Sequence, residues 1–173
     1  MQINGDRIYL KLLTPEDVDQ SYVDWMNDPE ITQFLESRWN TYSLEEIKEY
    51  VKQTNSTTSN FLFGIFLKDT NEHIGNIKIG NINQTHKFGD VGLIIGKKAV
   101  WCKGYGAEAI QLLTRYSFEK LGLNKIIAGI YANNLGSYKA FVKCNYREVG
   151  RLKNHRWYKD SFVDEILVEK GRE

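Results

Sequence analysis

The sequence predicts a mixed α/β (α+β) fold in which one strongly twisted sheet is flanked by helices. Strand-like and helix-like segments follow one another in the order β-α-α-β-β-β-α-β-α-β-β. A strand, a helix and a second strand within residues 89–131 imply a parallel βαβ unit, whereas hairpins on either side imply antiparallel pairing. No linker, repeat or low-complexity segment is visible, so we expect a single domain, 1–173.

The first elements are a strand and a helix. Residues 7–13 (RIYLKLL) alternate in the manner of a strand. Thr14, followed by a proline and two carboxylates, is a typical helix start, and we expect this helix to run to about Met26.

Two further helical starts follow. Pro29 disfavours helical geometry at the residue before it, so a new helix or turn begins within residues 27–30. Residues 36–40 (ESRWN) look irregular. The capping box at 43–46 (SLEE) then predicts a helix that ends near Lys52.

The middle of the chain is rich in strands. After a polar loop at 55–60, residues 61–67 and 73–82 flank the turn 68–72 and predict a β-hairpin. Residues 89–96 form a third strand of this group.

The last third alternates between helices and strands. Residues 105–121 have a broad apolar face and form the strongest predicted helix. Residues 125–131 are nearly all apolar, as in a strand covered on both faces. A helix at 135–144 follows, and residues 146–151 pair with 162–168 in a closing hairpin.

Composition excludes several classes of protein. With 23 Lys and Arg against 22 Asp and Glu, the net charge of +1 gives no sign of a nucleic-acid or anionic-membrane partner. The N-terminus lacks a signal-peptide pattern and no apolar run approaches the ~20 residues of a membrane span, so we expect a cytoplasmic protein. Cys102 and Cys144 lack metal-ligand spacing, so we expect reduced thiols and no metal.

The stretch 101–107 (WCKGYGA) is the most informative local motif. A strand, then Gly104 and Gly106, then a helix from Tyr105 bring unpaired N–H groups and the positive end of a helix dipole together. This arrangement suits an anion, and Lys103 adds a positive charge. The alternative is a tight turn only, because the third glycine of the dinucleotide fingerprint and the Gly-Lys-Ser/Thr of a P-loop are absent.

Motifs along most of the chain resemble one family. Residues 101–109 (WCKGYGAEA), Asn134 with Ser137, residues 142–146 (VKCNY) and residues 25–31 (WMNDPEI) together resemble the GNAT superfamily of acyl-CoA N-acyltransferases. The similarity is to the branch that contains ribosomal-protein N-terminal acetyltransferases and amino-sugar acetyltransferases. It implies an acetyl-CoA-dependent N-acetyltransferase.

The resemblance also implies a cofactor site. Strands 89–96 and 125–131 would start parallel and then splay apart to admit the pantetheine arm of acetyl-CoA. The implied cofactor-binding residues are Leu93, Ile94 and Ile95, whose main chain would pair with pantetheine amides; Lys103, Gly104, Tyr105, Gly106 and Ala107, which would cradle the pyrophosphate; and Asn134 and Ser137 at the next helix start. Asn134 could instead be purely a helix cap.

Three positions depart from the family pattern. Cys102 replaces a glycine, and we interpret it as a packing residue rather than a nucleophile. Asn145 replaces another glycine, which is tolerable because Asn visits the left-handed region. Phe141 stands where many relatives carry the tyrosine that protonates the leaving thiolate, and it cannot donate a proton.

The catalytic residues are therefore less clear than the cofactor site. Tyr138, one turn earlier, could protonate the thiolate, or it could be a packing residue or surface hydroxyl. Asp90 could act as base through water, or it could be an exposed strand-end carboxylate. The amide N–H groups of residues 94–96 are the expected oxyanion donors.

Residues 36–39 are the expected acceptor-binding segment. Arg38 could hold a phosphate and Trp39 could stack on a base or sugar, although a surface loop with a half-buried Trp is the alternative. Residues 155–158 (HRWY) have a similar composition. These features favour an amino-sugar nucleotide as acceptor; a protein N-terminus of ribosomal type, or a non-catalytic CoA-binding module, are the alternatives. A homodimer is plausible because the closing hairpin leaves a strand edge exposed.

Overall fold

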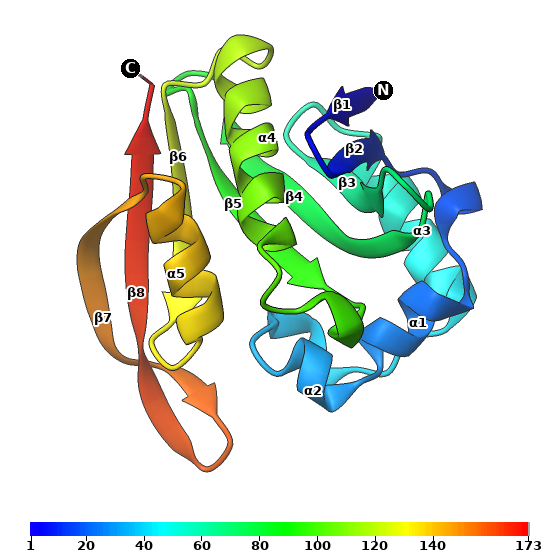
Figure 1. The fold of residues 1–173 in the computed structure, drawn as a ribbon. Helices are drawn as coiled ribbons and strands as arrows, with labels where there is room; N and C mark the ends of the chain where they lie inside the picture. The colour runs from blue at the N-terminus through cyan, green and yellow to red at the C-terminus, as the bar shows by residue number, and fades with distance from the viewer. Residues whose placement is uncertain (173) are drawn as a thin grey trace.

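A computed structural model describes residues 1–172, and its backbone contains one eight-stranded sheet of order β1-β2-β3-β4-β5-β6-β8-β7 (Figure 1). The strands are β1 (Gln2–Asn4), β2 (Ile8–Leu12), β3 (Phe61–Leu67), β4 (His73–Asn83), β5 (Phe88–Ile95), β6 (Lys125–Tyr131), β7 (Arg147–Tyr158) and β8 (Ser161–Gly171). The helices are α1 (Gln20–Met26), α2 (Pro29–Thr32), α3 (Leu44–Asn55), α4 (Tyr105–Glu119) and α5 (Leu135–Lys143), with short 3-10 turns η1 (Pro15–Asp17), η2 (Glu36–Trp39) and η3 (Lys98–Val100). The predicted fold class is confirmed.

The sheet consists of two antiparallel halves joined by a short parallel contact. Strands β1 to β5 pair antiparallel in sequence, and β6, β8 and β7 form the second antiparallel group. The predicted βαβ unit joins them, because β5 and β6 pair in parallel through α4. This pairing covers only 88–90 and 125–127, and beyond it the two strands diverge (Figure 1).

Two apolar clusters cover the two faces of the sheet. The larger packs α4 and α5 onto β2 to β6 and β8, with Phe63, Ile110 and Phe141 among its fully buried members. The smaller packs α1 and α3 onto the other face, around Trp25, Val51 and Leu62. The alternation of Leu62 and Phe63 between the two clusters follows the two-residue period of a strand. Helices therefore cover both faces where α1 and α3 pack, as predicted. The prediction that residues 125–131 are covered on both faces was wrong, because β6 alternates between buried and exposed residues and Ile127 is 37% exposed.

The single helix predicted from Thr14 to Met26 was wrong. The Asp17 carboxylate accepts hydrogen bonds from both the amide and the hydroxyl of Thr14, which stabilises only the short turn η1. Val18 is then extended, with φ −86° and ψ 112°. Asp19 caps a new helix by accepting from the amide of Tyr22 at 3.0 Å. Two capping carboxylates in succession thus divide the segment.

Other boundaries differ less. The capping box of Ser43 and Glu46 is confirmed, but α3 continues to Asn55 rather than ending near Lys52. The segment described as irregular, 36–40, contains the turn η2. Strand β1 was not predicted, and both strands of the closing hairpin are longer than the predicted 146–151 and 162–168.

Candidate active site

The turn between β5 and α4 exposes backbone donors. Gly104 has φ +84°, a left-handed conformation that glycine adopts without a steric penalty, and it caps α4. The first helical bond runs from the amide of Glu108 to the carbonyl of Gly104, at 3.1 Å. The amides of Tyr105, Gly106 and Ala107 precede that bond, so they have no intrahelical acceptor and point toward the positive end of the helix dipole.

Arg7 and Glu108 hold this turn against the start of β2. The Arg7 guanidinium donates to the carbonyl of Lys103 and to the Glu108 carboxylate, both at 2.9 Å, and lies 4.5 Å from the centre of the Tyr105 ring. Burial alone would raise the pKa of the Glu108 carboxyl, but bonds from the amides of Arg7 and Ile8 and from the guanidinium outweigh it and hold that pKa below its usual value. Sequence reasoning missed this pair, because its members are 101 residues apart.

A cavity of about 630 Å³ opens where β5 and β6 diverge. The expected cofactor-binding residues border it with one exception: Leu93, Ile94, Ile95, Gly104, Tyr105, Gly106, Ala107, Asn134 and Ser137 line it, whereas Lys103 does not. The Asn134 side chain caps α5 by accepting from the amide of Ser137 at 3.2 Å. Asn134 thus acts as a cap and also borders the cavity.

Part of the β5 backbone is already bonded within the protein. The carbonyl of Ile95 accepts from the indole N–H of Trp101 at 2.8 Å. The amide of Gly96 donates to the carbonyl of Ile74 at 2.9 Å. Of the three expected oxyanion donors, Gly96 is therefore committed elsewhere. Ile94 lies two residues earlier, points to the same side and pairs with Asn76 of β4, so only the amide of Ile95 remains a candidate.

The two expected catalytic side chains lie outside the lining of this cavity. Asp90 accepts from the Asn81 amide group at 2.5 Å. The Tyr138 hydroxyl donates to Glu148 at 3.1 Å, and this bond to a carboxylate raises the pKa of Tyr138. Phe141, in contrast, borders the cavity and packs edge-on against Tyr146. The structure does not bring Asp90 and Tyr138 together, so their roles remain predictions.

The two cysteines and Asn145 have distinct environments. Cys102 is exposed, so its interpretation as a packing residue was wrong; it has φ +61°, in the left-handed region that glycine favours. Asn145 has φ +63°, which agrees with its tolerance for that region. Cys144 is buried, its thiol donates to the carbonyl of Ala107 at 3.2 Å, and burial raises its pKa.

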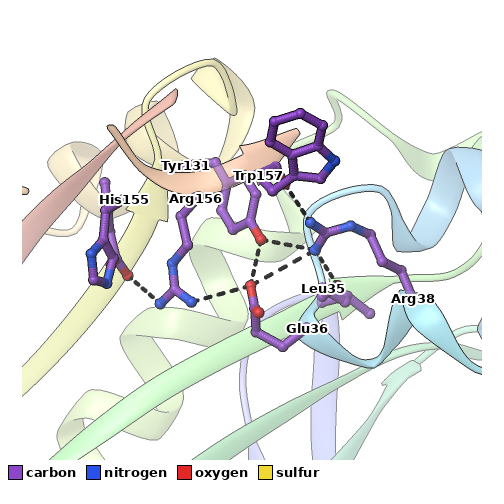
Figure 2. Close-up of polar contacts among 8 residues, drawn as sticks. Leu35, Glu36, Arg38, Tyr131, His155, Arg156 and Trp157 are labelled. Atoms are coloured by element: carbon purple, nitrogen blue, oxygen red, sulfur yellow. Dashed lines mark hydrogen bonds and ion pairs between the residues drawn. The ribbon is translucent and has the colours of Figure 1, made fainter. Parts of the chain in front are cut away.

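Arg38 joins η2 to the closing hairpin. Its guanidinium donates to the carbonyls of Leu35 at 2.7 Å and Trp157 at 2.6 Å, and to the Tyr131 hydroxyl at 2.8 Å (Figure 2). Its side chain is only 12% exposed, and Trp39 lies on its face at 4.1 Å. The guanidinium expected to hold a phosphate is thus largely engaged with protein acceptors.

A charged cluster extends from Arg38 through Tyr131 and Glu36 to Arg156 (Figure 2). The Tyr131 hydroxyl donates to Glu36, and Arg156 lies between Glu36 at 3.3 Å and the buried Glu165 at 2.8 Å. Burial and the bond to Glu36 raise the pKa of Tyr131. We call Glu36, Arg38, Tyr131, Arg156 and Glu165 the mouth cluster. Tyr131 lines the cavity and was missed from the sequence, where it was only the last residue of a strand.

Among residues 1–172, no group of three or more His, Cys, Asp or Glu side chains could hold a metal ion. No helix within the same range is long and apolar enough to cross a membrane.

Comparison with known proteins identifies the family. Residues 7–147 match the model of the acetyltransferase (GNAT) domain. The uncharacterized N-acetyltransferase p20 of Bacillus licheniformis is 27% identical over 162 residues, which cover 92% of this chain and 89% of that protein.

Solved structures share the fold. The ribosomal-protein-S5-alanine acetyltransferase from Vibrio fischeri superposes with a TM-score of 0.86 at 19% identity, covering 99% of this chain and 96% of that one. The spermidine N-acetyltransferase from Vibrio cholerae, in complex with CoA and spermine, superposes with a TM-score of 0.85 at 20% identity, covering 96% of each chain. With the matched domain spanning most of the chain, the protein belongs to the GNAT acetyltransferase family and is an acetyl-CoA-dependent N-acetyltransferase.

Proposed function

We propose that this enzyme transfers an acetyl group from acetyl-CoA directly to the primary amine of an amino-sugar nucleotide. One observation carries the proposal: a single cavity is bordered by the free amides of the α4 start on one side and by an aromatic wall next to arginines on the other. A thioester and an amine that enter from the two sides would meet between β5 and β6.

The donor side has the chemistry that acetyl-CoA requires. A β-carbon on Gly106 would come within 3.4 Å of the Leu93 side chain, so glycine keeps this approach to the backbone open. Free amides and the helix dipole suit the pyrophosphate. Beyond residue 90, β5 has no strand on its β6 side, which leaves main-chain groups for the pantetheine amides. When bound, acetyl-CoA supplies the activated acyl group.

The acceptor side suits a sugar or base carrying an anion. Phe34 stacks on Tyr158 at 5.1 Å and meets Tyr131 edge-on at 5.7 Å, which gives flat apolar surfaces. Arg38 and Arg156 lie beside these rings. Both nearby carboxylates, Glu36 and Glu165, are already paired with Arg156, so this wall differs from the acidic groove that a basic protein tail would require.

The reaction needs a neutral amine, a proton acceptor and stabilisation of the developing oxyanion. The amide of Ile95 is the proposed oxyanion donor. Asp90 would take the amine proton through water, and Tyr138 or water would supply a proton to the thiolate. Because neither side chain lines the cavity, each would act through solvent or after rotation.

The test is release of CoA from acetyl-CoA in the presence of amino-sugar nucleotides, basic N-terminal peptides or polyamines, with mass spectrometry of the product. We expect turnover with the sugar nucleotides. Turnover with peptides alone would identify a protein N-terminal acetyltransferase instead. Tight CoA binding without turnover on any of the three would contradict the proposed acceptor and favour a CoA-binding module.

A further inference from the structure

One oxygen of Glu36 accepts a hydrogen bond from a tyrosine and forms ion pairs with two arginines. The Tyr131 hydroxyl donates to Oε1, and the same atom lies 3.3 Å from Arg156 Nη1 and 3.7 Å from Arg38 Nη1. Two guanidinium groups and a hydroxyl thus converge on a single carboxylate oxygen (Figure 2). Such a set of donors is typical of sites that bind carboxylates and phosphates.

The three donors are fixed by contacts that do not involve Glu36. Arg38 is bonded to the carbonyls of Leu35 and Trp157. Arg156 is bonded to the buried carboxylate of Glu165, and the Tyr131 ring packs edge-on against both Phe34 and Tyr158. The donors would therefore keep their positions if the Glu36 carboxylate left.

Glu36, in contrast, is weakly fixed. Its side chain is 60% exposed, compared with 12% for Arg38 and 29% for Arg156. It stands at the start of a four-residue 3-10 turn, and rotation of its side chain would return the carboxylate to water at little cost. An exposed carboxylate on a preformed set of buried donors can be exchanged for another anion.

Charge and hydrogen bonding favour such an exchange. Without Glu36, the mouth cluster holds two guanidinium groups against one carboxylate, Glu165. The buried Nε–H of Arg156 has no hydrogen-bond acceptor among residues 1–172. An entering oxyanion would restore neutrality and would accept the hydrogen bond that the Tyr131 hydroxyl now donates to Glu36.

We infer that Tyr131, Arg38 and Arg156 form an anion subsite for the acceptor, and that Glu36 occupies this subsite as an internal substitute until an acceptor displaces it. The inference deepens the proposed function and rests on it: the entering anion would be a phosphate of the sugar nucleotide. Because Tyr131 lines the cavity, an anion held there would place the remainder of the acceptor toward the splayed strands.

The test uses inorganic phosphate as probe, with acetate as a carboxylate probe, and follows the Arg156 Nε–H resonance by NMR. The protein is first saturated with CoA, so that the α4 turn does not compete for phosphate. We compare the parent enzyme with Glu36→Ala. If Glu36 fills the subsite about nine-tenths of the time, its removal tightens phosphate binding roughly tenfold. The affinity for acetate should increase less than the affinity for phosphate.

Two further variants make the result specific. Glu49→Ala removes the same charge from a side chain of similar exposure on α3, and we expect unchanged phosphate affinity. The double variant Glu36→Ala, Tyr131→Phe has the same change in charge but lacks one hydrogen-bond donor. Much of the increase in phosphate affinity should therefore disappear.

The inference is overturned if Glu36→Ala binds phosphate no more tightly than the parent, or if phosphate leaves the Arg156 resonance unchanged. It is also overturned if Glu36→Ala chiefly weakens the binding of acceptors that carry no anionic group, because Glu36 would then bind the ammonium group of the acceptor. Failure of the proposed function gives a different result: CoA does not bind in the first titration, or sugar nucleotides are not acetylated although phosphate binding responds as expected.

Discussion

Single residues with left-handed backbone shape the turn that precedes α4. Gly104 is at φ +84°, and Cys102, two residues earlier, is at φ +61°. Only glycine adopts this region without interference from a β-carbon. The same turn thus contains one residue suited to its conformation and one that is strained.

Exchanges at these two positions should have opposite effects. Gly104→Ala introduces a β-carbon at positive φ and should lower the free energy of unfolding by about 1–2 kcal/mol. Cys102→Gly relieves strain but gains entropy in the unfolded chain, so we expect a net increase of about 0.5–1 kcal/mol. Urea unfolding of both variants measures the difference. If both substitutions changed the free energy of unfolding by the same amount in the same direction, the predicted strain at Cys102 would be contradicted.

Individual site residues were predictable only where the local pattern carries the signal. The glycines of the turn and the cap at Asn134 could be read from neighbouring residues. The contact of Tyr131 with Glu36 joins residues 95 positions apart, so no local pattern reveals it. Arg38 was predicted to bind a phosphate. Its guanidinium donates to the carbonyls of Leu35 and Trp157 instead, and no local pattern in the sequence predicts that the segment of Trp157 lies next to Arg38.

At the scale of elements, α4 is anchored at its first turn. The Glu108 carboxylate accepts from the amides of Arg7 and Ile8, at 2.8 Å and 3.2 Å, and pairs with the Arg7 guanidinium. A negative charge at this end of a helix also interacts favourably with the dipole. The anchor connects the turn that would bind pyrophosphate to the edge of β2.

Glu108→Gln should therefore destabilise the protein in a pH-dependent manner. We expect a loss of about 1–3 kcal/mol in the free energy of unfolding at neutral pH, because a charged acceptor of three bonds is weakened. The native pKa of Glu108 is lowered, so its stabilisation is complete above the unfolded pKa of ~4.3 and is lost as pH falls through the native value. Urea unfolding at neutral and acidic pH measures both effects.

A matched control is available on α3. Glu45 also stands in the first turn of a helix, but it is exposed. Glu45→Gln should change stability by less than about 0.5 kcal/mol at neutral pH. If the two variants behaved alike, the dipole and not the Arg7 contact would explain the effect of Glu108.

The divergence of β5 from β6 predicts where CoA changes the backbone. Strand pairing ends at Asp90 and Ile127. The β5 amides beyond that point that alternate away from β4, those of Val91, Leu93 and Ile95, therefore have no strand partner on the β6 side. Hydrogen exchange of the peptide covering residues 91–95 should slow when CoA is added. Exchange of 61–67 in β3, which is paired on both sides, should not change. Slowing at α4 alone would place the pantetheine arm elsewhere.

Most elements could be predicted because one face of each is buried. The periodicity of the sequence failed to predict elements that have no buried face. Most residues of β7 are exposed and the strand forms an edge of the sheet, so its length leaves no alternation in the sequence. The break at Val18 depends on which carboxylate caps which amide, and the sequence 14–26 is equally compatible with one helix or with a turn followed by a helix.

At the scale of the whole molecule, the two halves of the sheet share only a short strand contact and the packing of α4 and α5. We propose that they nevertheless unfold together as one domain, because the larger apolar cluster spans both halves. Calorimetric and van't Hoff enthalpies should then agree. Two separate transitions would contradict this.

CoA should stabilise the entire fold. A ligand that binds only the native state at 100 times its Kd adds about 2.7 kcal/mol. For a chain of this size the expected rise in Tm is roughly 5–10 °C. Differential scanning at several CoA concentrations measures it. We expect a single unfolding transition that moves to higher temperature. Two transitions of which only one moves would contradict the proposed single domain.

The cavity walls come from different parts of the chain. Residues within 30–35 and 91–143 line the cavity. The mouth cluster draws on 36–38 and 156–165 and shares only Tyr131 with that lining. Replacing these two short segments with those of another protein of this fold could therefore change the acceptor, while the residues that bind the thioester stay the same. The same partition gives evolution a modular route to new substrates.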